Sequence, residues 1–307
     1  MNPGANREWV LTSPYERFFD FIAPQADRFG ILLEHIQKLG LNSVVISVEE
    51  GRHFFIFPRN VNLKFSRGVS FPFRGLNPVM LTAHYDRVPD SPGANDNSAA
   101  VFQLLKTALL LGKQDVDRWV IIFTDKEELQ KGERIQNQGA YSLAKKLKKW
   151  GLANARIFNF DACGAGDTFV ISATADRLLS NQTKAGLQRA RLRIKDLREQ
   201  ALACARHLSK VLLLPTPFSD DAGFMQGGIP VQTITMLPAN EAAAFASLLR
   251  IRPLFADAVI AGSLNESGRK LLPETWRCIN GPSDSHTRLT PEHYNRIVRF
   301  AADLCRK

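Results

Sequence analysis

The sequence predicts an α/β fold of three layers, in which a mixed, mostly parallel central sheet carries helices on both faces. Short apolar runs of strand length alternate with longer stretches that have apolar residues at helical spacing. This alternation is typical of parallel strands joined by crossover helices. The chain has 307 residues, 45% of them hydrophobic, which is enough for a full core. We expect one domain over residues 1–307.

The N-terminal part, residues 1–75, is expected to hold a helix followed by a strand meander. Residues 15–40 have apolar side chains at helical spacing, interrupted near Pro24. Residues 43–66 contain a β-branched run and an aromatic run separated by a turn, which predicts two strands.

From residue 78 onward, strands and helices alternate regularly. The expected strands are residues 78–86, 119–125, 155–161, 168–174 and 229–237. The expected helices are residues 98–111, 138–150 and 240–250, and residues 251–285 have an irregular pattern. Gly112 suits the C-cap of the first helix, and the last helix should begin with Thr290 as N-cap and Pro291 at the first helical position.

The formal charge of +10 comes largely from two basic stretches. One covers residues 145–149, and the other covers residues 184–198. The second lies in a predicted helical segment, residues 176–215, which is also a candidate cap over a pocket. No aromatic residues interleave with these charges, and no nucleic-acid motif accompanies them. Solvated helix faces are therefore favoured, and no nucleic-acid partner is expected.

The cysteine pattern and the absence of apolar segments indicate a cytoplasmic protein. The four cysteines are too few and too scattered for a disulfide framework, which favours thiols kept reduced. The first residues, MNPGANREWVLTS, lack the apolar core of a signal peptide. No uncharged run reaches about 18 residues, so no membrane span is expected. The oligomeric state is not predicted.

The run HYDRVPDSPGANDNSAA, residues 84–100, carries the strongest functional signal. It takes an apolar strand into a Gly/Pro loop that holds a histidine and several acids. The Glu127–Glu128 pair and Asp161 each lie just past a further apolar run. Each pattern is common by chance, but ligands gather beyond the carboxyl ends of parallel strands. Three such strand ends together indicate a divalent-metal site.

A two-metal site needs a bridging carboxylate, terminal ligands and a base. Asp96 suits the bridge because its loop, GANDN, can bring it close to two cations. His84 suits a terminal nitrogen ligand, and Asp86 could orient its imidazole. Asp161 offers a terminal oxygen. Within the Glu127–Glu128 pair, one carboxylate can bind metal while its neighbour acts as base.

These ordered motifs resemble those of the M28 family of metallo-aminopeptidases. The resemblance covers about residues 78–300 and rests on His84-Tyr-Asp86, PGANDNSAAV, Glu127-Glu128, NFDACG, GIPVQTI and GPSDS. It implies a phosphorylase/hydrolase-like fold of the zinc-peptidase type. It also implies hydrolysis of N-terminal residues from a peptide substrate, by metal-activated water with Glu127 as general base.

The resemblance also implies the ligand set. It assigns His84 and Asp161 to the first metal, Asp96 to the bridge and Glu128 to the second metal. In the family, the peptide bond after the bridging aspartate is often cis, so a cis bond is expected between Asp96 and Asn97.

The chain departs from the family pattern at the last ligand. Asn280 stands where the family has a histidine, and His286 lies six residues downstream as an alternative ligand. A carbonyl oxygen in place of an imidazole nitrogen should weaken the second site and make harder ions more competitive. We therefore expect a zinc centre with one tight and one weak site, with Mn²⁺ or Co²⁺ as alternatives.

Two other functions stay open alongside the aminopeptidase. A glutaminyl-cyclase-like acyltransferase would hold one zinc through the equivalents of Asp96, Glu128 and the late histidine, which this chain lacks. A catalytically impaired, peptidase-like binding protein is the other, because Asn280 replaces a ligand. Asp220 and Asp221 are candidates for binding the substrate amine, with helix capping as the alternative.

Overall fold

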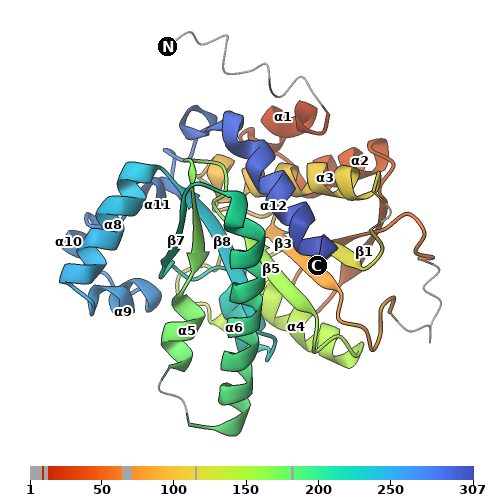
Figure 1. Cartoon of the computed structure of the whole chain (residues 1–307). Coiled ribbons are helices and arrows are strands. Elements are labelled where there is room, and N and C mark those ends of the chain that lie inside the picture. Colours follow the sequence, from red (N-terminus) through yellow and green to blue (C-terminus); the bar gives the residue numbers. More distant parts are fainter. Residues whose placement is uncertain (1–8, 10–12, 64–70, 115, 181–182) are drawn as a thin grey trace.

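Eight strands form one mixed sheet at the centre of the molecule (Figure 1). The fold is taken from a computed structural model, which describes residue 9 and residues 13–63, 71–114, 116–180 and 183–307. The strands are β1 (Asn42–Ser47), β2 (Arg52–Phe57), β3 (Val79–His84), β4 (Trp119–Thr124), β5 (Arg156–Phe160), β6 (Thr168–Ser172), β7 (Val211–Leu214) and β8 (Val231–Leu237). The last residues of the predicted meander, 64–66, lie outside the described residues.

The order of the strands confirms the predicted sheet. It is β1-β2-β4-β3-β5-β8-β6-β7. The four adjacent strands β4, β3, β5 and β8 are parallel to one another. At one side, β2 joins β4 and β1 joins β2, both antiparallel. At the other side β6 is antiparallel to β8, and β7 is parallel to β6. Four carboxyl ends therefore meet at one edge of the sheet.

Helices cover both faces of the sheet, which confirms the three layers. Successive residues of a strand point to opposite faces. In β3, Leu81 accordingly packs in one core cluster and Met80 in the other. The first face carries α3 (Ala99–Leu111), α6 (Ala185–Cys204) and α12 (Tyr294–Arg306). The second face carries α4 (Gly139–Lys149) and α7 (Asp220–Gln226).

The basic segment forms α6, which packs on the sheet. It contacts β5, β6 and β8, and it also lies against α12. Its buried side chains, Ile194, Leu197, Ala201 and Cys204, recur at helical spacing. Most of the lysines and arginines of α6 therefore fall on the solvent face.

Beyond the β7 side of the sheet, four helices form a separate group, α8 (Ala239–Ile251), α9 (Phe255–Ile260), α10 (Glu266–Arg269) and α11 (Glu274–Cys278) (Figure 1). Of these helices, α8, α9 and α11 contribute to a third apolar cluster around Phe245 and Trp276. The expectation that residues 251–285 are irregular was wrong. The three helices there have only four to six residues each. Helices of that length give no sustained apolar period, so their sequence resembles loop.

Two further expectations need correction. Residues 211–214 form β7 rather than the end of a helical region, because a run of four apolar residues does not distinguish a strand from a buried helix turn. Thr290 is at the N-cap position before Pro291, as expected, but the element that begins there is the turn Pro291–His293 leading into α12, and the Thr290 side chain makes no capping hydrogen bond. Its Oγ1 instead accepts a hydrogen bond from the Gly166 backbone N–H at 2.8 Å, which ties the C-terminal part of the chain to the loop after β5.

The remaining elements are short, apart from α2 (Arg28–Lys38). They are α1 (Phe18–Ile22), α5 (Thr174–Leu179) and the turns η2 (Tyr15–Arg17), η3 (Ala94–Ser98), η4 (Ile135–Asn137), η5 (Ala205–His207), η6 (His286–Arg288) and η7 (Pro291–His293). The predicted helix over 15–40 is thus interrupted at the expected place.

The four cysteines are unpaired. No helix among the described residues is long and apolar enough to cross a membrane.

Candidate metal centre

Three neighbouring strands deliver the candidate ligands to one edge of the sheet. His84 is the last residue of β3 and is paired in register with Thr124, the last residue of β4. Asp161 directly follows β5, and its backbone N–H donates to Ile234 O in β8 at 3.0 Å. Because these strands are parallel, the residues that follow β4 meet His84 and Asp161 at the same edge.

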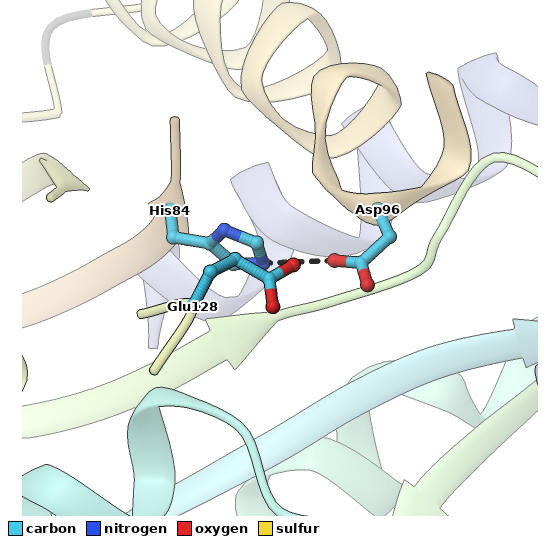
Figure 2. Close-up of side chains that lie close together, drawn as sticks. All are labelled: His84, Asp96 and Glu128. Atoms are coloured by element: carbon cyan, nitrogen blue, oxygen red, sulfur yellow. Dashed lines mark ion pairs between the residues drawn. The ribbon is translucent and has the colours of Figure 1, made fainter. Parts of the chain in front are cut away.

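Side chains from these strand ends and from the loop after β3 surround His84. Its Nε2 lies 2.9 Å from Asp96 Oδ1 and 3.8 Å from Asp161 Oδ1. Its Nδ1 lies 3.4 Å from Asp86 Oδ1, on the other side of the ring. His84, Asp96 and Glu128 each offer a ligand atom within 4.8 Å of the others, and their side chains point toward one another (Figure 2). Five of the predicted site residues, His84, Asp86, Asp96, Glu128 and Asp161, are therefore brought together.

The loop that carries Asp96 is bent and firmly held. It begins after Gly93, whose φ of 60° is left-handed, and it departs from helical geometry at Asp96 and Asn97. The bond between these two residues is cis, as the family resemblance implied. Asn97 Nδ2 donates to Phe160 O at 2.8 Å, which fastens the loop to the end of β5.

Two residues to which the sequence assigned no role, Asp284 and Arg28, hold this loop in place through hydrogen bonds. The Asp284 carboxylate accepts the backbone N–H groups of Asn95, at 2.9 Å, and of Asp96, at 3.0 Å. The buried Arg28 guanidinium donates to Asp86 O at 2.9 Å and to Ser98 Oγ. Asp284 lies in the GPSDS landmark, but its contact spans 188 residues of sequence and no local pattern reveals it.

The Glu127–Glu128 pair follows a backbone turn at Lys126, whose φ is 56°. Asp86 Oδ2 accepts the Glu128 N–H at 3.0 Å, so Asp86 contacts both the His84 ring and the backbone of the glutamate pair. Gln138, which no sequence signal marked, donates through Nε2 to Glu127 Oε1 at 3.2 Å. These contacts set the directions of the two carboxylates.

Asn280 lies next to the cluster, and His286 packs elsewhere. With its amide turned to satisfy its hydrogen bonds, Asn280 Nδ2 lies 2.6 Å from Glu128 Oε1 and 3.3 Å from Asp96 Oδ2. Its φ of 61° brings it into the left-handed region, which asparagine tolerates better than most residues. His286 lies edge-on against Phe19, with ring centroids 5.0 Å apart. Of the two alternatives, Asn280 is the neighbour of Glu128.

The cluster carries more negative charge than its own histidine can balance. Burial and the charge of Asp96 raise the pKa of Glu128 to about 9. Burial, together with Glu128 and Asp161, also raises the pKa of Glu127 well above its usual range, although His84 opposes this. Burial disfavours the charged imidazole, but the carboxylates of Asp161, Asp86 and Asp96 together raise the pKa of His84 well above 6.5.

This donor set fits a divalent cation. Both ring nitrogens of His84 and the Oδ1 atoms of Asp86 and Asp161 are buried without a properly oriented hydrogen-bond partner. Buried polar atoms are rarely left in that state. One imidazole and several carboxylates are ligands that zinc accepts in proteins. A cation bound at His84 Nε2 would satisfy that nitrogen and Asp161 Oδ1, and it would offset the repulsion among the carboxylates, while His84 Nδ1 faces Asp86 on the other side of the ring.

Asp220 and Asp221 lie behind the cluster and do not border its cavity. Asp220 is fully buried, and its Oδ2 accepts from Thr124 Oγ1 at 2.5 Å. Asp221 accepts from the Ser219 N–H and from Thr233 Oγ1, both at 3.0 Å. Burial raises the pKa of Asp220 to about 7 and that of Asp221 to about 6. This geometry gives no direct contact with a substrate amine.

A cavity of about 290 Å³ opens in front of the cluster. One wall is formed by Asp96, Glu127, Glu128, Asp161 and Asn280. The rest of the lining is largely apolar and includes Leu129, Ile135, Phe218, Ala222, Trp276 and Ile279, together with Gln138 and three threonines. No described residue of α6 lines it, and α11 contributes Trp276 instead. The cavity therefore joins a cation site to a small apolar pocket.

An α/β sheet with this donor set at its carboxyl edge fits a metal-dependent hydrolase, and the family match places the protein in that class. The sequence matches peptidase family M28 over residues 70–297, which is well over half of the chain, and the protein belongs to this family. A comparison with curated protein sequences gave no match.

Solved structures share the fold at low sequence identity. A leucine aminopeptidase precursor from Bacteroides thetaiotaomicron is 14% identical, with a TM-score of 0.60 over 99% of this chain and 96% of its own. A glutaminyl cyclase from the same organism is also 14% identical, with a TM-score of 0.60 and coverage of 99% and 97%. BSAP, a zinc aminopeptidase from Bacillus subtilis, is 18% identical, with a TM-score of 0.51 over 83% of this chain. The match spans only 49% of the length of BSAP.

Proposed function

We propose that the protein is a metal-dependent aminopeptidase that removes N-terminal residues from peptides. The observation that carries this proposal is the cavity of about 290 Å³, whose lining combines the carboxylates of the cluster with apolar side chains. The negative charge of the cluster attracts a cationic terminal amine, and the apolar part of the lining accepts the side chain that follows it. The limited volume suits a single terminal residue, since longer chain must extend out of the cavity.

The residues divide into two groups of metal ligands. His84, Asp96 and Asp161 are proposed to hold a tightly bound ion, with Zn²⁺ as the expected metal. A second ion would share Asp96 with Glu128 and Asn280. When bound, a divalent ion supplies Lewis acidity that lowers the pKa of water and polarises a carbonyl group.

The chain's own residues provide proton transfer and orientation. Glu127 faces the cavity and is held by Gln138 Nε2 at 3.2 Å. Its carboxylate can take a proton from the attacking water and deliver it to the leaving amine. Asp86 contacts the His84 ring and accepts the Glu128 N–H, so it orients a ligand on each side of the centre.

Asn280 supports the proposal that the second site is weak. With its amide turned to satisfy its hydrogen bonds, its nitrogen lies 2.6 Å from Glu128 Oε1, and this hydrogen bond must be broken before a cation can take both residues as ligands. Metal analysis of the purified protein after dialysis should give one zinc ion per chain, with a second ion bound only when metal is added. Two ions retained through dialysis would contradict the weak second site.

Aminopeptidase activity can be tested with a panel of aminoacyl chromogenic substrates and added Zn²⁺, Mn²⁺ or Co²⁺. Wild type should release the chromophore from substrates with a free amine, and N-acetylated substrates should not react. Glu127→Gln should lose this activity. Glu133→Gln, an exposed change in the same loop, is the matched control and should keep it.

Two alternative functions are separated by the same panel. Glutaminyl cyclisation would convert a peptide with N-terminal glutamine into its pyroglutamyl form with release of ammonia, without cleavage of a peptide bond. A binding protein would show no turnover with any metal, and the amide of Asn280 against Glu128 is the observation that favours it. We also propose a cytoplasmic location, which the four unpaired cysteines support.

A further inference from the structure

A larger cavity, of about 880 Å³, lies around β7 and is separate from the metal centre. Its lining includes the strand residues Leu212, Leu213 and Leu214, together with residues of α5, α6, α8 and α9. In Figure 1, β7 lies between α6 and the group formed by α8 and α9. The cavity is therefore a groove along the edge of the sheet, and we call it the β7 groove.

The strand in this groove has an open edge. β7 is the last strand of the sheet and pairs only with β6 among the described strands. Ala173 N–H donates to Leu214 O, so Leu214 faces β6. Because alternate residues of a parallel strand pair with the same neighbour, the backbone of Leu213 faces outward. Its side chain is 46% exposed, and no hydrogen bond links its backbone to another element in the described part of the chain.

The groove is rich in arginine. Four arginines line it, and Asp176 is the one acidic residue among the lining residues that the structure describes. Arg198 pairs with Asp176, and Arg177 pairs with Asp257.

Two of these arginines have only neutral partners within the described residues. Arg191 donates to the backbone O of Ser180 at 3.3 Å, and Arg250 donates to Ser247 Oγ at 3.2 Å. Both side chains are exposed, so they offer two guanidinium groups to a ligand.

We propose that the β7 groove binds an extended acidic peptide segment of another protein, by strand addition to β7. An added strand would pair its backbone with the outward groups of β7, and its carboxylates would meet Arg191 and Arg250. The groove lining has no aromatic side chain on which a nucleic-acid base could stack. A second copy of this chain would bring the same basic groove into a two-fold contact, which charge repulsion disfavours.

The test uses a fluorescein-labelled peptide of alternating Glu and Val, six residues long. Its N-terminus is blocked by the label and its C-terminus is amidated, so it offers no free amine to the proposed peptidase. Fluorescence anisotropy at low salt should show saturable binding to the full chain. The corresponding Gln-Val peptide should bind at least about tenfold more weakly, because it lacks the charges. The Glu-Val peptide N-methylated at alternate residues should also bind weakly, because it cannot pair as a strand.

The double variant Arg191→Glu/Arg250→Glu should weaken binding of the acidic peptide at least about tenfold. Arg189→Glu/Lys145→Glu is the matched control, since it makes the same change in net charge at exposed positions that do not line the groove. The control should bind within about twofold of wild type. Far-ultraviolet circular dichroism and thermal midpoints would confirm that both variants are folded.

Four results would overturn the proposal. Equal binding by the two double variants would show that only the general positive charge acts. Equal binding of the N-methylated peptide would exclude strand addition. A single-stranded oligonucleotide that displaces the peptide from the groove at lower concentration than unlabelled peptide would assign the groove to nucleic acid. Absence of any peptide binding would also refute the proposal. The arginines would then be explained as charges that protect an open sheet edge from aggregation.

Discussion

Replacement of Asp284 tests the prediction that a residue outside the ligand set holds the metal centre together. Its carboxylate is 1% exposed and accepts two backbone N–H groups, at 2.9 Å and 3.0 Å, from the residues that place Asp96. Asp284→Ala would leave both donors buried without a partner. Each such donor costs about 1–3 kcal/mol, and a water molecule admitted by the smaller side chain offsets part of the loss. We expect a decrease of about 2–4 kcal/mol in the free energy of unfolding.

The same change should weaken metal binding, because Asp96 loses the contacts that fix its backbone. Changes in residues that orient ligands typically reduce metal affinity by about 10–100-fold. Urea denaturation of the metal-free protein measures the stability, and competition with a chelating dye measures the affinity for zinc. Asp90→Ala, at an exposed acid, is the control and should alter neither quantity. A loss below about 0.5 kcal/mol with unchanged zinc affinity would refute the reasoning.

Three further predictions follow from the site and the core. Glu127→Gln should lower kcat by about 10²–10⁴-fold in steady-state kinetics. Metal analysis should show an unchanged metal content. A decrease in bound zinc would instead indicate that Glu127 is a metal ligand. Asn280→His should raise the metal affinity of the second site by at least about tenfold in a competition titration, because an imidazole replaces an amide that hydrogen-bonds to Glu128. An unchanged affinity would contradict the proposed second site.

Burial holds the pKa of His53 at about 4. The unfolded chain therefore takes up a proton below about pH 6.5 that the folded protein does not, and stability should fall by about 3 kcal/mol between pH 6.5 and 4. Urea denaturation of His53→Gln over this pH range should show a smaller decrease in the free energy of unfolding than wild type. An equal dependence on pH in the two proteins would exclude His53 as the cause.

The sequence predicted the parallel part of the sheet and the strand ends at which the candidate ligands lie, because both depend on local patterns. His84 and Asp161 lie at or just past the ends of apolar runs, and the carboxyl ends of parallel strands share one edge. The orienting contacts of Arg28, Gln138 and Asp284 could not be predicted in this way. They join segments 11 to 188 residues apart, and only the packing of loops from different parts of the chain brings them together.

The last ligand of the proposed centre is a second case in which sequence alone could not predict the contact. Spacing alone left Asn280 and His286 open, because six residues of extended chain can reach about 20 Å. The structure separates them through packing, since the His286 ring lies against Phe19 while Asn280 lies against Glu128. A resemblance of ordered motifs can locate a candidate ligand position, but only the packing of neighbouring side chains shows which residue lies near it.

The centre that we propose is asymmetric, and the asymmetry follows from how each half is held. The proposed ligands of the first site come from strand ends and from a loop fastened by Asn97 to β5, so their positions are set by the core of the sheet. The proposed second site depends on Asn280, an exposed residue in the segment after α11. Trp276, in that same helix, belongs to the apolar part of the cavity lining. A substrate whose side chain packs against Trp276 would contact α11, the helix next to Asn280. Bound substrate should therefore raise the zinc occupancy of the second site more than that of the first. Zinc titrations with and without a non-hydrolysable amino-acid analogue can measure this difference, and equal effects on both sites would exclude the coupling.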